Sequence, residues 1–191
     1  MMTRGLEIGF LLDRQWHALR GEMETTKRPA IMALARVLAD TATPYAIIGG
    51  IALQVHRAEP RTTLDIDLAV PRLEVIPRAE LQAAGFRPRG RFAHSDNWLG
   101  PEGVPVQFTD DPALAPAVER ALEIELDDVR IRVIGRSDLL HEKLRAGSDP
   151  ARRRSKRLQD LADAQALLED TPELRMELSE AEQAILDSIP E

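Results

Sequence analysis

Apolar residues first recur at helical spacing along this chain and then form the patterns typical of strands. An i, i+3, i+4, i+7 stripe predicts an amphipathic helix and consists of Ile31, Leu34, Ala35 and Leu38. Pro44 ends the connection that follows. Residues 45–48 are a continuous apolar run, which predicts a short buried strand.

The segment 63–70 alternates between two faces, as a half-buried strand does. One face carries Thr63, Asp65, Asp67 and Ala69. The other face, expected to be buried, carries Leu64, Ile66, Leu68 and Val70. At a rise of ~3.3 Å per residue the two aspartates start roughly 6.6 Å apart, so both carboxylates can reach one cation.

Further short segments extend the predicted sheet. Residues 104–108 predict a third strand, with Pro105 at a sheet edge or a strand start. Residues 123–134 alternate as a β-hairpin that turns at Asp127 and Asp128. Between them, 86–103 predict a loop or hairpin beside the site. Four of its residues either line a substrate mouth or belong to an ordinary surface loop: His94, Asp96, Asn97 and Trp98.

Helical patterns dominate both ends of the chain, and the last helix is predicted to begin at Thr171-Pro172. The predicted fold class is therefore α/β (α+β), with a mixed β-sheet flanked by helices and a C-terminal helical region. The expected division is an N-terminal helical extension over 1–23, a core over 24–135 and a helical region over 136–191 packed on that core.

Composition narrows the classes of protein and site. With 191 residues and 43% hydrophobic content the chain can bury a core, and without cysteine it has no disulfide or thiolate metal site. No apolar run approaches the roughly 20 residues of a membrane span and no signal peptide is evident, so we expect a cytoplasmic protein without membrane contact. The net charge of −7 argues against a general nucleic-acid binder.

A local basic cluster interrupts this acidic chain and consists of Arg152, Arg153, Arg154, Lys156 and Arg157. It is either a solvated helix face or a surface that holds a polyanion or a triphosphate.

Two neighbouring elements point to phosphoryl chemistry. The Asp65–Asp67 pair is a hard-oxygen site suited to Mg²⁺, or to Mn²⁺. Gly49 and Gly50 admit close backbone approach, and the helix that follows presents free N–H groups to a phosphate. Each element alone fits an ordinary buried βαβ unit. The two in this order and at this spacing favour a phosphate and metal site.

The order and spacing of these residues carry a resemblance to a family. Ile47-Ile48-Gly49-Gly50 followed by Arg61-Thr62-Thr63-Leu64-Asp65-Ile66-Asp67-Leu68 resembles the signature of DNA polymerase β-like nucleotidyltransferases, and most of all their AbiEii-type branch, which includes toxins of toxin–antitoxin and phage-defence systems. The resemblance implies a nucleotidyltransferase-like fold, an NTP substrate and Mg²⁺ or Mn²⁺ held by Asp65 and Asp67.

The C-terminal half extends the resemblance. The segment 138–144 is similar to a family helix whose lysine, here Lys143, faces the nucleotide. The segment 157–163 is similar to a motif in which Asp160 orients that lysine or the metal shell, with Gln159 in place of the usual lysine. Without the family, ordinary pairing on a helix explains these residues, for instance Lys156 with Asp160.

Arg61 has two interpretations. As a loop arginine it pairs with Glu59 or Asp65; as a site residue it contacts a phosphate or orients the aspartate strand, as the resemblance implies. His56 is expected to cap or pack the short helix rather than to act in catalysis.

Two positions depart from the family pattern. Ile51 follows Gly-Gly where a hydroxyl residue is usual, and Gln107 stands where polymerase-like members place a third acid. An amide cannot deprotonate a hydroxyl. Asp110 or Asp111 at the strand end are the possible substitutes.

Two hypotheses follow. The first is a Mg-dependent nucleotidyltransferase that moves a nucleoside monophosphate from an NTP to an acceptor hydroxyl on RNA or tRNA, a protein or a small molecule. For this hypothesis the resemblance implies the context of a toxin with a cognate antitoxin. The second is a catalytically silent member that binds nucleotide or a partner protein, for which Gln107 and Ile51 are the support.

Overall fold

One mixed β-sheet of seven strands forms the body of the protein, in the order β3-β4-β5-β2-β1-β7-β6. The computed structural model describes residues 3–21 and 26–188. The strands are β1 Ala46–Ile48, β2 Ile66–Ala69, β3 Arg87–Phe92, β4 Ser95–Leu99, β5 Pro105–Thr109, β6 Leu122–Leu126 and β7 Val129–Val133. The pairs β1–β7 and β2–β5 are parallel, and the other neighbours are antiparallel.

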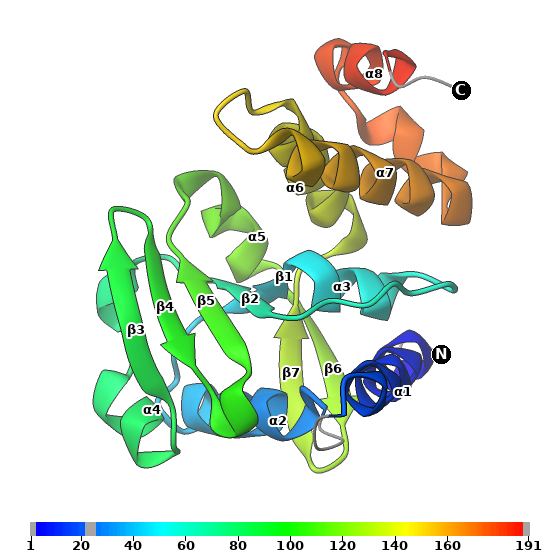
Figure 1. Cartoon of the computed structure of the whole chain (residues 1–191). Helices are drawn as coiled ribbons and strands as arrows, with labels where there is room; N and C mark the ends of the chain where they lie inside the picture. The colour runs from blue at the N-terminus through cyan, green and yellow to red at the C-terminus, as the bar shows by residue number, and fades with distance from the viewer. Residues whose placement is uncertain (1–2, 22–25, 189–191) are drawn as a thin grey trace.

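Helices cover this sheet and extend beyond it. The α-helices are α1 Thr3–Leu19, α2 Arg28–Asp40, α3 Gly49–His56, α4 Arg78–Ala83, α5 Ala115–Glu119, α6 Arg136–Ser148, α7 Arg154–Asp170 and α8 Glu180–Asp187. Short 3₁₀ turns are η1 Leu73–Val75, η2 Pro101–Gly103, η3 Pro112–Leu114 and η4 Pro172–Glu177. In Figure 1, α6, α7 and α8 gather at one end of the molecule, across α3 from α1 and α2. The predicted fold class is confirmed.

The hydrophobic core lies between the sheet and its helices. The predicted apolar stripe of α2 is buried, as are the apolar residues of β1 and of the hairpin β6–β7 that face the same interior. Pro105 is the first residue of β5, a central strand, so the start of a strand is the correct interpretation of that proline.

Helix α1 packs directly on α3 through two glycines. A Cβ at Gly5 would lie 2.0 Å from the carbonyl oxygen of Gln54, and one at Gly9 would lie 2.4 Å from the Gln54 side chain. Gln54 Nε2 in turn donates to the Arg61 carbonyl at 2.9 Å. The helix therefore supports the loop that leads into β2.

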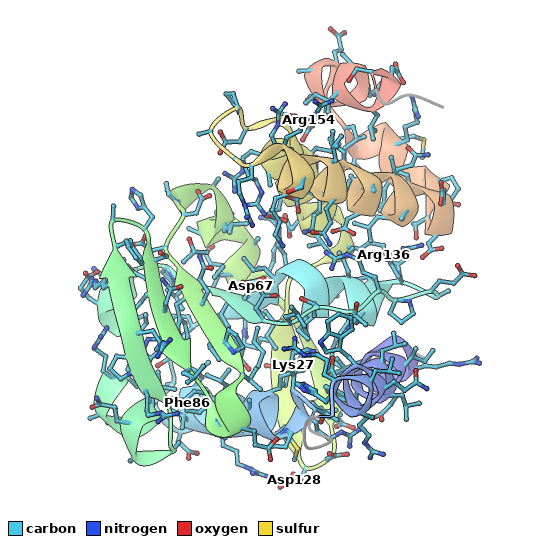
Figure 2. All side chains as sticks on the ribbon, in the orientation of Figure 1. Lys27, Asp67, Phe86, Asp128, Arg136 and Arg154 are labelled. Carbon is cyan, nitrogen blue, oxygen red and sulfur yellow. The ribbon has the colours of Figure 1, made fainter. Side chains whose placement is uncertain are left out.

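A buried lysine adds a second support to that loop. Lys27 forms an ion pair with Asp13 of α1, and its Nζ donates to the Thr63 carbonyl at 2.6 Å. Figure 2 shows Lys27 between α1 and the strands. This contact fixes the backbone two residues before Asp65.

Two expectations from the sequence need correction. Strand β2 begins only at Ile66, so Leu64 lies in the loop and is 63% exposed instead of buried. The predicted last helix is two elements, η4 and α8, because Ser179 and Glu182 form a capping box that starts a new helix. Of the two forms expected for 86–103, a loop or a hairpin, the segment forms the hairpin β3–β4 at the outer edge of the sheet.

The three-part division of the chain at 23/24 and 135/136 stays a prediction, and its first boundary lies outside the described residues. Within residues 3–21 and 26–188, none of the helices has the length and apolar character needed to cross a bilayer.

Candidate functional site

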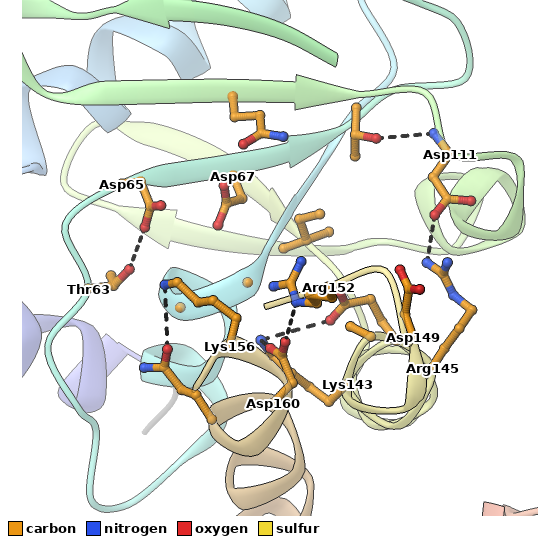
Figure 3. Close-up of a pocket in the computed structure, with 18 of the residues that line it drawn as sticks. Thr63, Asp65, Asp67, Asp111, Lys143, Arg145, Asp149, Arg152, Lys156 and Asp160 are labelled. Carbon is orange, nitrogen blue, oxygen red and sulfur yellow. Dashed lines mark hydrogen bonds and ion pairs between the residues drawn. The ribbon is translucent and has the colours of Figure 1, made fainter. Parts of the chain in front are cut away.

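A cleft of about 540 Å³ separates the sheet from α6 and α7. From the sheet side it is lined by Gly49, Gly50, Asp65, Asp67 and Gln107, and from the helical side by Lys143, Arg145, Arg152, Arg153, Lys156 and Asp160. Figure 3 shows Asp65 and Asp67 on the sheet side, facing Lys156 and Arg152. The residues predicted to bind metal or nucleotide thus line one cleft: Gly49, Gly50, Arg61, Asp65, Asp67, Lys143 and Asp160.

The Gly-Gly pair is required by the closeness of the aspartate strand. Ile48 pairs with Asp67 across antiparallel β1 and β2, and Gly49 then enters α3 with a φ of +62°. A Cβ at Gly49 would lie 2.4 Å from Asp67 Oδ2, and one at Gly50 would lie 2.5 Å from the Thr63 side chain. Both positive φ and close approach demand glycine at Gly49. The start of α3 therefore lies directly against the Asp67 carboxylate.

The Asp65–Asp67 pair has the electrostatics of a cation site. Burial, and then the neighbouring Asp65 carboxylate, raise the pKa of Asp67 to about 7. The Thr63 hydroxyl donates to Asp65 Oδ1 at 2.8 Å and so orients that carboxylate. A divalent cation between the two would stabilise the ionised form of both acids. The oxygen-only donor set fits Mg²⁺ or Mn²⁺.

The protein supplies only part of a metal shell. Among the described residues there is no group of three or more His, Cys, Asp or Glu side chains suited to holding a metal ion. Mg²⁺ commonly binds through one or two carboxylates and completes its shell with water and substrate phosphates. Two carboxylates beside a cleft with basic side chains fit that mode.

Gln107 occupies the position next to Asp67 on the parallel neighbour strand. Asp67 and Gln107 are register partners in β2 and β5, and both line the cleft, as the predicted alternation requires. A neutral amide therefore stands where a third carboxylate would adjoin the pair. Of the two possible substitutes, Asp111 lines the cleft and pairs with Arg145 at 2.7 Å, whereas Asp110 pairs with His94.

Lys143 is buried in an ionic network on the helical side. Its Nζ lies 2.8 Å from Asp160 Oδ1 and 3.4 Å from Asp163 Oδ2. Burial lowers the pKa of Lys143, but the charges of Glu142, Asp160 and Asp163 outweigh burial and leave the pKa raised. The lysine is charged, borders the cleft and already has two carboxylate partners.

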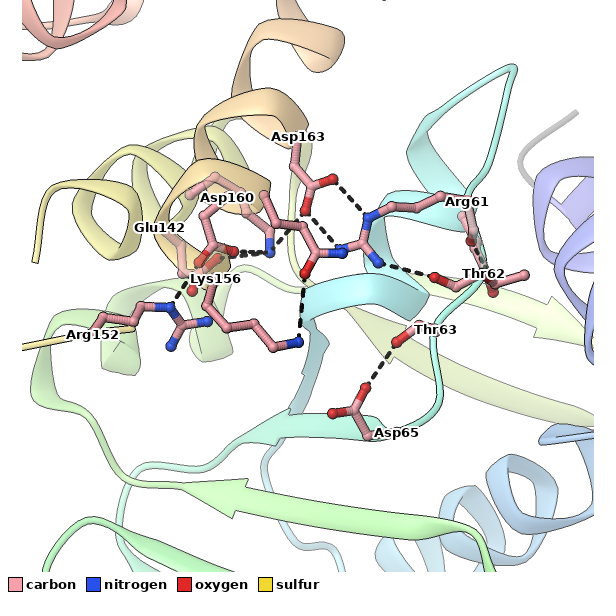
Figure 4. A network of polar contacts seen from close by, with 12 residues as sticks. Arg61, Thr62, Thr63, Asp65, Glu142, Arg152, Lys156, Asp160 and Asp163 are labelled. Carbon is pink, nitrogen blue, oxygen red and sulfur yellow. Dashed lines mark hydrogen bonds and ion pairs between the residues drawn. The ribbon is translucent and has the colours of Figure 1, made fainter. Parts of the chain in front are cut away.

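The same network holds Arg61, as Figure 4 shows. Arg61 Nε and Nη2 donate to the two oxygens of Asp163 at 2.8 and 2.7 Å. Of the two interpretations of Arg61, the one in which it pairs with Glu59 or Asp65 is therefore wrong. This fork joins the loop before β2 to α7 and fixes the path of the chain into Asp65.

Asp163 is the residue that sequence analysis missed. It ends the segment 157–163 and lies three residues after Asp160, so both carboxylates lie on one face of α7. That spacing was the available signal.

The partner of Asp160 differs from the ordinary helix pairing with Lys156. Asp160 Oδ2 accepts from Arg152 Nε at 2.8 Å, whereas Lys156 contacts Gln159 at 3.5 Å.

The basic cluster divides between the cleft and the helix surface. Arg152, Arg153 and Lys156 line the cleft, and Arg157 donates to the Gly147 carbonyl. The cleft lining holds six acidic side chains, Asp65, Asp67, Asp111, Glu142, Asp149 and Asp160, and six basic ones, Arg61, Lys143, Arg145, Arg152, Arg153 and Lys156. The cleft is thus balanced in charge although the chain is acidic.

The hairpin residues do not form a substrate mouth. None of His94, Asp96, Asn97 and Trp98 lines the cleft. Asp96 and Trp98 are buried, where Arg78 of α4 pairs with the acid and lies over the indole ring.

His56 packs α3, as expected. Its Nε2 donates to the Ile134 carbonyl at 2.7 Å, and burial lowers its pKa.

Comparisons with known proteins agree with this geometry. Residues 74–191 match the family described as "Nucleotidyl transferase AbiEii toxin, Type IV TA system", a match that begins after Asp67. No curated protein matches the chain.

Similar solved structures share the fold. An antigenic nucleotidyltransferase-like protein from Paracoccidioides brasiliensis has a TM-score of 0.57 at 21% identity, covering 84% of this chain and 85% of that one. ANT(2")-Ia in complex with adenylyl-2"-tobramycin has a TM-score of 0.55 at 15% identity, and the match covers 85% of this chain and 98% of that one. The Megavirus polyadenylate synthase has a TM-score of 0.50 at 15% identity, and the match covers 78% of this chain and 33% of that one. With a family match over more than half of its length, this chain belongs to the AbiEii nucleotidyltransferase family and has the polymerase β-like nucleotidyltransferase fold.

Proposed function

We propose that the protein is a Mg²⁺- or Mn²⁺-dependent nucleotidyltransferase that moves a nucleoside monophosphate from an NTP to an acceptor hydroxyl. The observation that carries this proposal is the placement of Asp65 and Asp67 against the Gly49 end of α3, across the cleft from basic side chains. Carboxylates for a cation and cations for a triphosphate thus border one space. The family generally uses divalent metals, which supports the same choice.

Each site residue has a distinct role in this proposal. Asp65 and Asp67 hold the metal, which when bound neutralises charge on the phosphates and aligns the reacting groups. The backbone at Gly49 and Gly50 approaches the triphosphate. Lys143 binds the same tail. Arg61 and Asp160 act through other residues: Arg61 fixes the loop before Asp65, and Asp160 holds Lys143 and Arg152.

In the reaction, the acceptor oxygen forms a bond to the α-phosphorus as the bond to the bridging oxygen of the β-phosphate breaks, and pyrophosphate leaves. The hydroxyl proton needs a base, and Gln107 cannot take it. Of the acids after β5, Asp111 lines the cleft but pairs with Arg145 at the end away from Asp65, so the hydroxyl proton passes to water. The acceptor is RNA, with a tRNA end as one form, a protein side chain or a small molecule, and the family context is that of a toxin with a cognate antitoxin.

A second candidate function is a silent family member that binds nucleotide or a partner protein. Two observations favour it: the amide of Gln107 beside Asp67, and the engagement of Lys143 by Asp160 and Asp163. The experiments below separate the two candidates.

The metal site can be tested with Asp67→Asn. Because the substitution removes one of two proposed ligands, Mg²⁺-dependent binding of ATP should fall at least ten-fold, as measured by isothermal titration calorimetry with and without Mg²⁺. Asp149→Asn is the matched control, since Asp149 lines the same cleft away from the pair. Wild-type protein whose ATP binding ignores metal would contradict the assignment.

The raised pKa of Asp67 predicts a pH dependence of stability. Between about pH 4 and pH 7 the unfolded carboxyl loses its proton while the folded one keeps it, so the free energy of unfolding falls as pH rises. Asp67→Asn removes this decrease in the free energy of unfolding, because asparagine does not titrate. In EDTA the variant should therefore unfold at a higher temperature than wild type at pH 8, and at the same temperature at pH 4. Differential scanning calorimetry measures both; a difference independent of pH would contradict the raised pKa.

The role of Lys143 can be tested with Lys143→Gln. Glutamine keeps a donor for Asp160, whereas an apolar residue would take one of two cationic partners from each of two buried carboxylates, and the loss of a buried partner costs roughly 3–5 kcal/mol. Loss of one charge-assisted contact should weaken ATP binding by on the order of 1.5–3 kcal/mol. AMP binding should change little, because AMP lacks the triphosphate tail. Equal weakening of both ligands would assign Lys143 a structural role only.

Gln107→Glu tests whether the missing acid limits the enzyme. A carboxylate beside Asp67 would add a metal ligand and a base, so Mg²⁺ affinity should rise and transfer of label from α-³²P-ATP to total RNA should appear or increase. Asn97→Asp is the control. Asn97 lies on β4 as the register partner of Gln107, and it does not line the cleft. Efficient wild-type transfer that drops in Gln107→Glu would mean that another base serves this chain.

A further inference from the structure

A second cavity, of about 270 Å³, adjoins the cleft on the side of α1. It shares Arg61, Thr63, Asp65, Lys156 and Gln159 with the cleft, and its outer wall adds Trp16, Thr62 and Leu64. A ligand in this cavity would therefore lie beside Asp65. Neither the family match, which starts at residue 74, nor the site described above gives Trp16 or Leu64 a function.

The outer wall is apolar and open to solvent. Trp16 is 44% exposed and Leu64 63% exposed, although both are large apolar side chains. A single exposed apolar residue needs no explanation. Here an aromatic ring and an aliphatic side chain from two separate segments, α1 and the loop before β2, line one cavity at the edge of the cleft. The two supports of that loop, Gln54 and Lys27, hold Leu64 near α1.

The cavity also presents a positive charge. Lys156 lies between the cavity and the cleft, and its Nζ contacts the Gln159 amide oxygen at 3.5 Å. Arg61, by contrast, is neutralised by Asp163. A flat ring surface suits a nucleobase, and the lysine beside it suits the adjoining phosphate and disfavours a polycationic acceptor.

The geometry of in-line transfer separates the two ends of the cleft. In Figure 3, Thr63, Asp65 and Lys156 lie at one end and Asp111, Arg145 and Asp149 at the other, with Asp67 between them. Attacking and leaving oxygens stand on opposite sides of the α-phosphorus. Arg145 at the far end suits the leaving pyrophosphate. The acceptor then enters at the end where Trp16 and Leu64 lie.

We propose that Trp16 and Leu64 form a subsite that stacks the terminal nucleobase of a single-stranded nucleic-acid acceptor, whose adjoining phosphate contacts Lys156. This inference rests on the proposed function and names its acceptor class. It assigns the cavity to the acceptor and not to the base of the NTP. The chain is acidic, and among the described residues the cations that line this cavity are Lys156 and Arg61, which fits the capture of one strand end and not of a long duplex.

The test uses the fluorescence of the protein itself. The chain has two tryptophans, and Trp98 is only 1% exposed, so quenching by a ligand reports on Trp16. We expect an adenylate hexaribonucleotide in EDTA, where no transfer occurs, to quench the emission, and Trp16→Phe to abolish the change. An abasic oligomer of the same length should not quench.

Affinity for a labelled hexaribonucleotide, measured by anisotropy, gives a second readout. Trp16→Ala should weaken binding roughly ten-fold, the scale of one lost base–aromatic stack. Phe92→Ala is the matched control, because Phe92 is an exposed aromatic residue of β3 that lines neither cavity, and it should leave binding unchanged. Lys156→Gln should reduce the salt dependence of binding.

Three outcomes would overturn the proposal: no quenching by the oligomer, equal quenching by the abasic oligomer, or equal quenching by MgATP alone, which would assign the cavity to the NTP base. Asp67→Asn should retain oligomer quenching. Quenching without any transfer would therefore sink the proposed function alone, and transfer to RNA without quenching would sink the subsite alone.

Discussion

The Asp163 carboxylate holds the two halves of the site together. It accepts a fork of hydrogen bonds from Arg61, which lies 102 residues earlier, and it also contacts Lys143 on α6. Both contacts are largely withdrawn from solvent, and removal of one partner from such a network costs roughly 3–5 kcal/mol. The loop before Asp65 and the two long C-terminal helices thus keep one relative position. The width of the cleft depends on that position.

The same network constrains what Lys143 can do. An ammonium with two carboxylate partners gains less from a phosphate than a solvated one, because a new contact must compete with existing ones. Arg152, the second partner of Asp160, stays 42% exposed on its side chain and can reach into the cleft. The buried lysine therefore offers the triphosphate a contact from a fixed position, whereas more exposed cations such as Arg152 can move with the ligand.

Local patterns in the sequence were sufficient to predict the side-chain directions in the central strands. They were insufficient to predict the ionic network of Arg61, Lys143, Asp160 and Asp163. Alternation placed Asp65, Asp67 and Gln107 toward one cleft, because side-chain direction in a strand is set by the nearest residues. The partner of Arg61 could not be found in this way, since the pairing spans most of the chain and depends on how α7 packs. Leu64 was misplaced for a related reason: Lys27 of another segment holds the Thr63 backbone and delays the start of β2.

Charge balance links metal binding to nucleotide binding in this cleft. Without a cation, burial and Asp65 hold the pKa of Asp67 near 7, so part of the protein carries a proton there at neutral pH. A triphosphate arriving alone would meet the acids of the pair and raise that pKa further, because like charges disfavour ionisation. A divalent cation reverses the sign of both interactions: it ionises Asp67 and attracts the phosphates. Each ligand must then strengthen the binding of the other by the same factor, as linkage requires. The Gly49 backbone lies so close to Asp67 Oδ2 that the cation and the triphosphate bind side by side, which makes this coupling large.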